Sequence, residues 1–184
     1  MSEEPARSHR PHPLVELARR AVEEFVRHGR VLAVPGPIPA DFQAPAGAFV
    51  TLKKRGELRG CIGTLAPTCP NQCQEVVQNA ISACCRDPRF PPVQAGELGH
   101  LQYQVYILGP SEPVGGLADL DPQRYGVIVH KSGRRGVLLP ALEGIETAEV
   151  QVAIACRKAG IDPADHPELE RFEVLTFQEV PDEP

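Results

Sequence analysis

The amino-acid sequence predicts an α+β fold, with a mainly antiparallel sheet and flanking helices. Two observations lead to this prediction. Strand-like segments are joined by short polar turns at 54–57 and 131–134, and such hairpins pair antiparallel strands. Three other segments carry apolar residues at helical spacing and lie before, between and after the hairpins. The predicted order in this chain of 184 residues is helix, hairpin, helix, strand, hairpin, helix, strand.

The first predicted helix follows a polar tail at 1–13 that contains three prolines and is expected to be disordered. From Leu14 to Phe25 the apolar residues recur at i, i+3, i+4, i+7, i+8 and i+11, which places them on one helical face. Pro13 suits the first helical position, and Gly29 suits the stop.

The first hairpin is predicted to join strands at 49–53 and 58–64. In the second of these strands, strict alternation divides the side chains between two faces. One face carries Leu58, Gly60 and Ile62, and the other carries Arg59, Cys61 and Gly63.

A second helix is predicted from Pro70 to Arg86, and the prolines of DPRFPP end it. Its apolar stripe comprises Cys73, Val76, Val77, Ala80, Ile81 and Cys84. Cys69 and Cys73 lack a second Cys or His pair with the spacing of a zinc site. These two cysteines, with Cys84 and Cys85, are therefore expected to pack as small apolar residues, and no metal site is predicted.

The third predicted helix begins after Thr147, a good N-cap, and stops at Gly160, with Arg157 and Lys158 in its last turn. The other predicted elements are a strand at 101–108, a hairpin of 124–130 with 135–139, and a final strand at 171–178 before a C-terminal tail at 179–184.

Composition limits the function classes. Lys and Arg number 19 against 24 Asp and Glu, a formal charge of −5, and there is no Trp, so binding of nucleic acid is disfavoured. The chain has no apolar run near the ~20 residues of a membrane span and no signal-peptide pattern. A cytoplasmic protein with reduced thiols is expected. No phosphate-binding loop or dinucleotide fingerprint occurs, so no cofactor is predicted.

The segment from Leu58 to Gly63 is the candidate site. Two glycines inside a strand weaken it, so Gly60 and Gly63 indicate close approach of a ligand or of a second backbone. Cys61 would then be a thiol with little cover, and a guanidinium on the same face, that of Arg59, would favour its thiolate.

Lys53 and Arg89 are predicted to line the same electropositive hollow. Two alternatives stay open: Cys61 packs in the core and the glycines mark a bulge, or another group assists the thiol. Candidates for such a group are His100, His130, Glu143, Glu146 and Glu149.

Three stretches resemble the AMMECR-domain family, and more narrowly its microbial members called AmmeMemoRadiSam system protein A. They are LRGCIGTLAP, NAISACCRDPRFPPV and RRGVLLPALEGIETAEVQVAIACRKAGI. The resemblance implies one AMMECR-like domain at 14–178, formed by two unequal lobes with a cleft that the 58–63 strand lines. The family name also implies association with a radical-AdoMet protein and a dioxygenase-like Memo-type protein. The family's activity is unsettled.

Two functions are compatible with these residues, so whether the protein is an enzyme stays open at this point. In the first, the protein is an enzyme or enzyme subunit in which Cys61 is a nucleophile or general acid/base. Arg59 would then assist the thiol, and Gly60, Gly63, Lys53 and Arg89 would bind substrate. In the second, it is a non-catalytic accessory protein that recognises an anionic ligand, RNA or a partner protein through the same strand.

Overall fold

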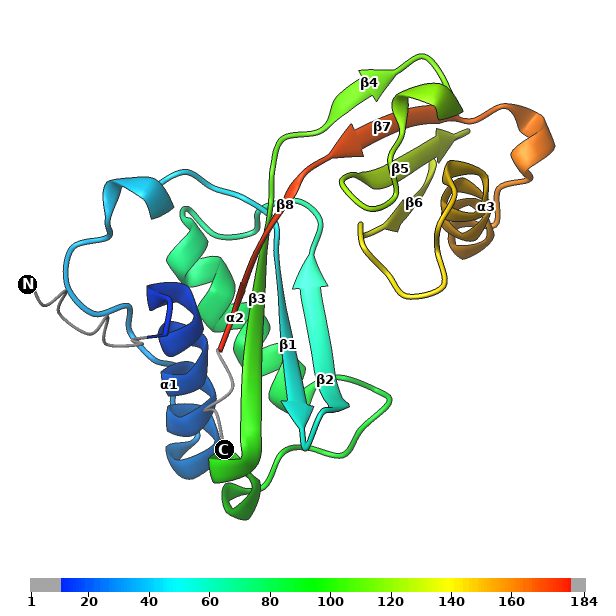
Figure 1. The fold of residues 1–184 in the computed structure, drawn as a ribbon. Helices are drawn as coiled ribbons and strands as arrows, with labels where there is room; N and C mark the ends of the chain where they lie inside the picture. Colours follow the sequence, from blue (N-terminus) through cyan, green and yellow to red (C-terminus); the bar gives the residue numbers. More distant parts are fainter. Residues whose placement is uncertain (1–10, 180–184) are drawn as a thin grey trace, which may run out of the picture. The chain divides into compact units, whose positions relative to one another are not determined.

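The computed structural model describes residues 11–179, so the predicted tails at 1–13 and 179–184 lie for the most part outside the described residues. The chain forms two compact units (Figure 1): residues 11–107 with 176–179 make unit 1, and residues 108–175 make unit 2. Each unit carries a four-stranded sheet and at least one helix, which confirms the predicted α+β fold with antiparallel pairing.

The sheet of unit 1, sheet A, has the strand order β2-β1-β3-β8, so β2 is an edge strand. Its strands are β1 (Ala48–Lys54), β2 (Glu57–Thr64), β3 (Leu101–Leu108) and β8 (Val174–Gln178). The β1–β2 turn contains Arg55 and Gly56, both with positive φ. Two successive residues with positive φ twist a tight hairpin in the sense that its strands require.

The first helix, α1 (Pro13–His28), begins and ends where the sequence predicts. Pro13 occupies the first turn, and the His12 imidazole caps the helix by accepting a hydrogen bond from the Leu14 amide at 3.3 Å. Gly29, with φ of 67°, ends the helix in the left-handed conformation that glycine adopts without strain. The His12 ring also stacks on Phe177.

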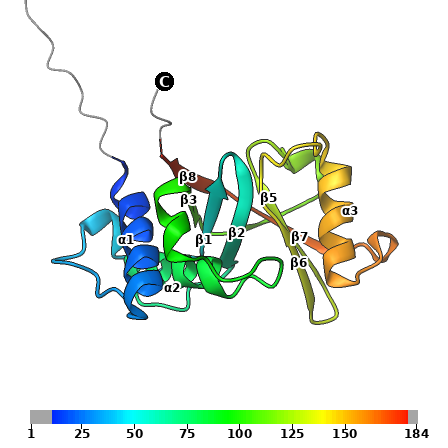
Figure 2. The same ribbon diagram turned by 90° about the horizontal axis from the view of Figure 1, so that it is seen from below.

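The second helix, α2 (Gln72–Cys85), packs with α1 and lies against β1 and β2. Figures 1 and 2 show both helices on one side of sheet A. The predicted apolar stripe of α2 is buried in full, from Cys73 to Cys84, against Val50, Leu52 and Val105 of the sheet. The other face of sheet A carries no helix of unit 1.

A β-bulge in β2 changes which residues share a face. Leu52 pairs with Gly60, but the next residue, Lys53, pairs with Leu58, so Arg59 is the extra residue. Directly paired residues point to the same side of a sheet. Gly60 therefore lies on the helix side with Leu52, whereas Leu58 lies on the opposite side with Lys53. The predicted strict alternation of Leu58 and Gly60 on one face is wrong because of this bulge.

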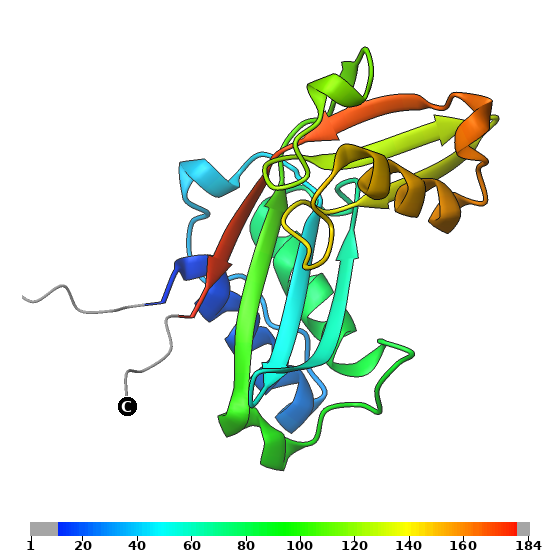
Figure 3. The ribbon, with the colours of Figure 1, turned by 45° about the vertical axis from the view of Figure 1, so that its right-hand side comes forward.

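The sheet of unit 2, sheet B, has the strand order β4-β7-β5-β6. Its strands are β4 (Glu112–Val114), β5 (Gly126–Lys131), β6 (Arg134–Leu138) and β7 (Glu168–Phe172). The short 3-10 helices η1 (Ala40–Phe42) and η2 (Ala95–His100) belong to unit 1, and η3 (Leu117–Asp119) and η4 (Pro163–Asp165) belong to unit 2. Helix α3 (Ala148–Ala159) lies along this sheet (Figure 3). Thr147 and Gly160 cap it as predicted. Gly136 allows its close approach, because a Cβ there would lie 2.0 Å from the Ala155 carbonyl oxygen.

The predicted single strand at 171–178 is in fact two strands that belong to different sheets. β7 ends at Phe172 and β8 begins at Val174, and the Glu173 carbonyl between them accepts a hydrogen bond from the Gly109 amide at 2.8 Å. No proline or glycine occurs at this break, so the local sequence does not predict it. The short strand β4, which contains Pro113, was not predicted; proline is tolerated there because β4 is an edge strand.

No helix within residues 11–179 has the length and apolar character that crossing a membrane would require.

Candidate functional site

The Cys61 thiol lies on the face of sheet A opposite α2. Its cross-strand partner is Thr51, whose chain neighbours Val50 and Leu52 both point into the core beneath the helices. Because side chains alternate along a strand, Thr51 and Cys61 point the other way. The Thr51 hydroxyl donates a hydrogen bond to the Cys61 sulfur at 3.1 Å. A donor aimed at sulfur stabilises the thiolate more than the thiol.

Polar side chains continue from Cys61 across the same face of the sheet. Thr51 pairs with Cys61 on β2 and with Gln104 on β3. The Gln104 amide donates to Gln178 of β8 at 2.8 Å, and the Tyr106 hydroxyl donates to Gln104 at 3.0 Å. Cys61, Thr51, Gln104 and Gln178, which we call the polar row, thus place one polar group on each strand of sheet A.

The backbone of Cys61 is held at the free edge of the sheet by Asp87 and Arg89. The Cys61 amide donates to Asp87 Oδ2 at 2.8 Å, and the Cys61 carbonyl accepts from Arg89 Nη2 at 3.3 Å. Both backbone groups on this edge would otherwise lack a partner in the sheet. The segment that ends α2 therefore fixes the position of the thiol.

Asp87 and Arg89 also bind each other through two nearly parallel hydrogen bonds. Arg89 Nε reaches Asp87 Oδ1 at 2.9 Å and Nη2 reaches Oδ2 at 2.7 Å, while the Arg89 amide donates to Oδ1 at 3.1 Å. The Asp87 side chain is 2% exposed and that of Arg89 is 54% exposed. The hydrogen bonds from Arg89, with the one from Cys61, hold the pKa of Asp87 well below its usual range despite burial.

Arg89 is a cation that interacts with the Cys61 thiol. Its pKa is raised first by the hydrogen bonds to Asp87 and further by the sulfur of Cys61, which lies within reach of the guanidinium. Its Nη1 group makes no hydrogen bond to any described residue. Arg89 thus combines a position fixed by Asp87 with one nitrogen, Nη1, that Asp87 does not occupy.

Arg59 takes a different partner from the one predicted. Its guanidinium donates to Glu97 of η2 at 3.1 and 2.9 Å, and Lys54 binds the same carboxylate at 2.8 Å. These bonds from Arg59 and Lys54 lower the pKa of Glu97 to about 2. The bulge accounts for the difference, because strict alternation would have placed Arg59 beside Cys61. The predicted catalytic roles of Cys61 and Arg59 stay predictions.

Both glycines of the segment are explained by packing inside unit 1. A Cβ on Gly60 would lie 2.2 Å from the Ala83 carbonyl oxygen of α2, so the second backbone that the glycine pattern predicts is that helix. A Cβ on Gly63 would lie 2.2 Å from the ring of Phe49. Lys53 is half-buried. Its strand register places its side chain on the same face of sheet A as that of Cys61.

The other candidate groups differ in their surroundings. His100, on η2, is exposed, as are Glu143, Glu146 and Glu149 of unit 2. His130 of unit 2 lies 3.0 Å from Glu170. Burial raises the pKa of Cys84 to about 12, so this thiol stays protonated in the core. Among residues 11–179, no three His, Cys, Asp or Glu side chains gather as a metal ion would need.

Sequence reasoning missed a buried carboxylate that shapes the chain after β2. Glu75 is fully buried in α2 and accepts hydrogen bonds from the Thr64 hydroxyl, from the Thr68 amide and hydroxyl, and from the Cys69 amide. Burial alone would raise the pKa of Glu75, but these donors lower it. Thr51 and Asp87 were also missed as site residues, although the position of Asp87 directly after a helix was a signal.

Comparison with known proteins finds a family that this chain resembles over nearly its whole length. The family model AMMECR1 matches residues 15–180. A Thermotoga maritima protein is 51% identical over 91% of this chain and 98% of its own length. A Clostridium acetobutylicum protein is 39% identical over 91% of this chain, but that match covers 36% of the longer relative. The crystal structure of an uncharacterized Pyrococcus horikoshii protein, 34% identical, superposes with a TM-score of 0.82 over 93% of this chain and 92% of that one. The chain therefore belongs to the AMMECR1 family.

Proposed function

We propose that this protein is an enzyme, or a subunit of one, that uses the Cys61 thiol as its reactive group. The observation that carries the proposal is the hydrogen bond from Thr51 to the Cys61 sulfur at 3.1 Å, with the Arg89 guanidinium beside the same sulfur. A hydroxyl donor and a cation both favour the thiolate, which is the nucleophilic form of cysteine. Arg89 takes the assisting role that the sequence assigned to Arg59.

The reaction class that suits this arrangement is attack of the thiolate on an electrophilic carbon of an anionic substrate. The sulfur electron pair forms the new S–C bond, and the leaving group departs with the electron pair of the bond that breaks. The thiol proton passes to water before attack. Arg89 Nη1 donates to the substrate anion, while Asp87 keeps the guanidinium in position through the other two nitrogens. Lys53, on the same face, adds a second positive charge.

The family resemblance supports a further part of the proposal, that this chain works with a radical-AdoMet protein and a Memo-type protein. A pull-down of the full chain from a cell that contains both proteins tests this part separately. If neither protein is recovered, the proposed partners are contradicted. The thiol chemistry is tested independently by the alkylation experiment below.

The test of the thiol chemistry is the rate of iodoacetamide alkylation at each cysteine of the native protein, followed by peptide mass spectrometry across pH. We expect Cys61 to react faster than Cys69 near pH 7, because a hydroxyl donor and a guanidinium lie beside its sulfur whereas burial raises the pKa of the Cys69 thiol. Thr51→Val and Arg89→Gln should each slow Cys61 and leave Cys69 unchanged.

The alternative is a binding or accessory protein that recognises a ligand through the polar row, and a specific feature favours it. Gln104 and Gln178 present amide groups next to Thr51, which suits hydrogen bonding to a polar ligand rather than bond breaking. If Cys61 reacts only after the protein unfolds, the enzyme proposal is contradicted and a role as a binding or accessory protein is favoured. Alkylation that is fast in the wild type and equally fast in both variants would contradict the roles of Thr51 and Arg89.

A further inference from the structure

A second row of side chains lies next to the polar row on the same face of sheet A. Phe49 of β1 pairs directly with Gly63 on β2 and with Tyr106 on β3. Val50 points into the core beneath the helices, so its two chain neighbours, Phe49 and Thr51, both point to the opposite face. We call Gly63, Phe49 and Tyr106 the aromatic row; it lies two residues along the strands from the polar row.

The ring of Phe49 lies over Gly63, on the strand that carries the thiol. A Cβ on Gly63 would lie 2.2 Å from Phe49 Cγ and 2.3 Å from Cδ1, so the ring occupies the space that a side chain would take there. Gly63 and Cys61 are two residues apart on the same face of β2, a separation of about 7 Å. The Phe49 ring therefore borders the space in front of the Cys61 sulfur.

Both rings of the aromatic row are partly accessible. Phe49 and Tyr106 are half-buried, and α1 and α2 lie against the other face of the sheet (Figures 1 and 2). The Tyr106 hydroxyl donates to Gln104 of the polar row at 3.0 Å. Burial, and after it the nearby Cys61, raises the pKa of Tyr106, so this hydroxyl stays a neutral donor. An apolar ring and fixed polar groups thus flank the same thiol.

We propose that the substrate of Cys61 carries a planar aromatic ring, which stacks on Phe49 while the thiolate attacks a carbon next to the ring. The inference rests on the proposed function, because it names the class of substrate for the same thiol. Offset-stacked and edge-to-face rings have centroids roughly 4.5–7 Å apart, so a ring held by Phe49 brings its substituents to the thiol. The sulfur electron pair forms the S–C bond, and the leaving group departs with the electron pair of the bond that breaks.

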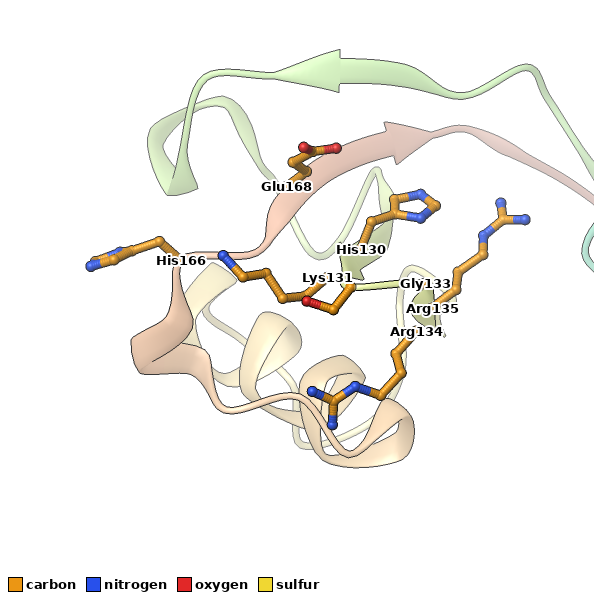
Figure 4. A pocket seen from close by; sticks show the side chains of 8 residues that line it. His130, Lys131, Gly133, Arg134, Arg135, His166 and Glu168 are labelled. Carbon is orange, nitrogen blue, oxygen red and sulfur yellow. The ribbon is translucent and has the colours of Figure 1, made fainter.

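Arg89 is the cation that we assign to the anionic group of this substrate, and a charged hollow in unit 2 is not an alternative. That hollow borders the tip of the β5–β6 hairpin (Figure 4). Lys131 pairs with Arg134 on one face of the hairpin. His130 pairs with Arg135 on the other face, because neighbouring residues of a strand alternate. The cations of that hollow therefore do not converge on one ligand.

A purely structural role for Phe49 is the alternative. An aromatic ring packed over a glycine of the neighbouring strand stabilises a sheet by itself. A loss of stability in a Phe49 variant would therefore not separate the two roles. The selectivity of Cys61 between two alkylating reagents separates them, because packing inside the protein does not depend on the reagent.

Iodoacetanilide and iodoacetamide are the two probes, since both present the same carbon and the same iodide leaving group and only the first carries a ring. The full-length protein is treated with each reagent at neutral pH, and the rate at Cys61 is followed by peptide mass spectrometry. The ratio of the two rates, divided by the same ratio for free glutathione, gives the ring selectivity. We expect a ring selectivity of about two- to tenfold at Cys61, the factor that one stacked aromatic pair contributes.

Three variants locate the source of the selectivity. Phe49→Leu should bring it down to that of glutathione, because leucine is apolar but cannot stack. Phe49→Tyr should keep it, because the ring remains. Phe42→Leu is the matched control: Phe42 is also a half-buried phenylalanine of unit 1, but it lies on η1 and packs against the core on the helix side. It should leave the selectivity unchanged.

The outcomes separate this inference from the proposed function. If Cys61 of the native protein reacts with neither reagent, the proposed function fails and this inference fails with it. If Cys61 reacts rapidly with iodoacetamide but is no more selective than glutathione, the thiol chemistry stands and the aromatic substrate class is overturned. Full selectivity in Phe49→Leu, or an equal loss in Phe42→Leu, would also overturn it. If Phe49→Leu does not fold, the selectivity of the wild type decides by itself.

Discussion

Replacement of Asp87 by Asn tests how strongly the segment after α2 holds the Cys61 strand. The Asp87 carboxylate accepts hydrogen bonds from the Cys61 amide and from three nitrogens of Arg89, and its side chain is 2% exposed. Hydrogen bonds to a charged group contribute about 1.5–3 kcal/mol each, and breaking a buried ion pair costs about 3–5 kcal/mol. Because Arg89 is half-exposed and regains water, we expect Asp87→Asn to lower the free energy of unfolding by about 2–3 kcal/mol.

The contribution of Asp87 to the free energy of unfolding should decrease as the pH falls. The pKa of Asp87 in the folded protein lies below its ordinary value of 3.8, so the unfolded chain binds the proton more tightly. The stabilisation by Asp87 is therefore complete above about pH 4 and is lost as the pH falls, by about 1.4 kcal/mol per pH unit. The difference between wild type and Asp87→Asn should shrink in the same way below pH 4.

Urea denaturation followed by circular dichroism at several pH values measures both quantities. Asp41→Asn is the control, because Asp41 is an exposed carboxylate of unit 1, and it should change stability by less than about 0.5 kcal/mol. An Asp87→Asn variant as stable as the Asp41 control at neutral pH would refute the reasoning, as would a difference from wild type that does not change below pH 4.

Three further predictions concern unit 1. Gly60→Ala should lower the free energy of unfolding by about 2–3 kcal/mol, because its Cβ would lie 2.2 Å from the Ala83 carbonyl oxygen. Gly99→Ala is the control: it has open space around it, and its free energy of unfolding in the same urea titration should lie within about 0.5 kcal/mol of wild type. Glu97, with its pKa lowered from 4.5 to about 2, should lose its stabilising effect as the pH falls through that range, and Glu97→Gln should remove this part of the pH dependence. Glu75→Gln should speed hydrogen exchange of the Thr68 and Cys69 amides, and unchanged exchange there would contradict the role given to Glu75.

The helices and the hairpins could be predicted because their signals are local. Apolar spacing and end signals such as Pro13, Thr147 and Gly160 act within one or two turns, and short polar turns specify hairpins by themselves. The 58–63 segment was also identified from sequence, since glycines inside a strand next to a cysteine stand out without any structure. The family resemblance pointed to the same residues.

The partners of the site residues were decided by tertiary structure. The bulge at Arg59 depends on how β2 pairs with β1, and it turns this guanidinium to Glu97. Arg89 reaches Cys61 from 28 residues away because α2 carries the chain back to the edge of the sheet.

The division of 171–178 between β7 and β8 likewise depends on two sheets and on no local residue pattern. Apolar spacing along a helix is a property of the chain itself, and the sequence determined it. Pairing across strands is a property of the packed molecule, so the fold decided which charges lie beside the thiol.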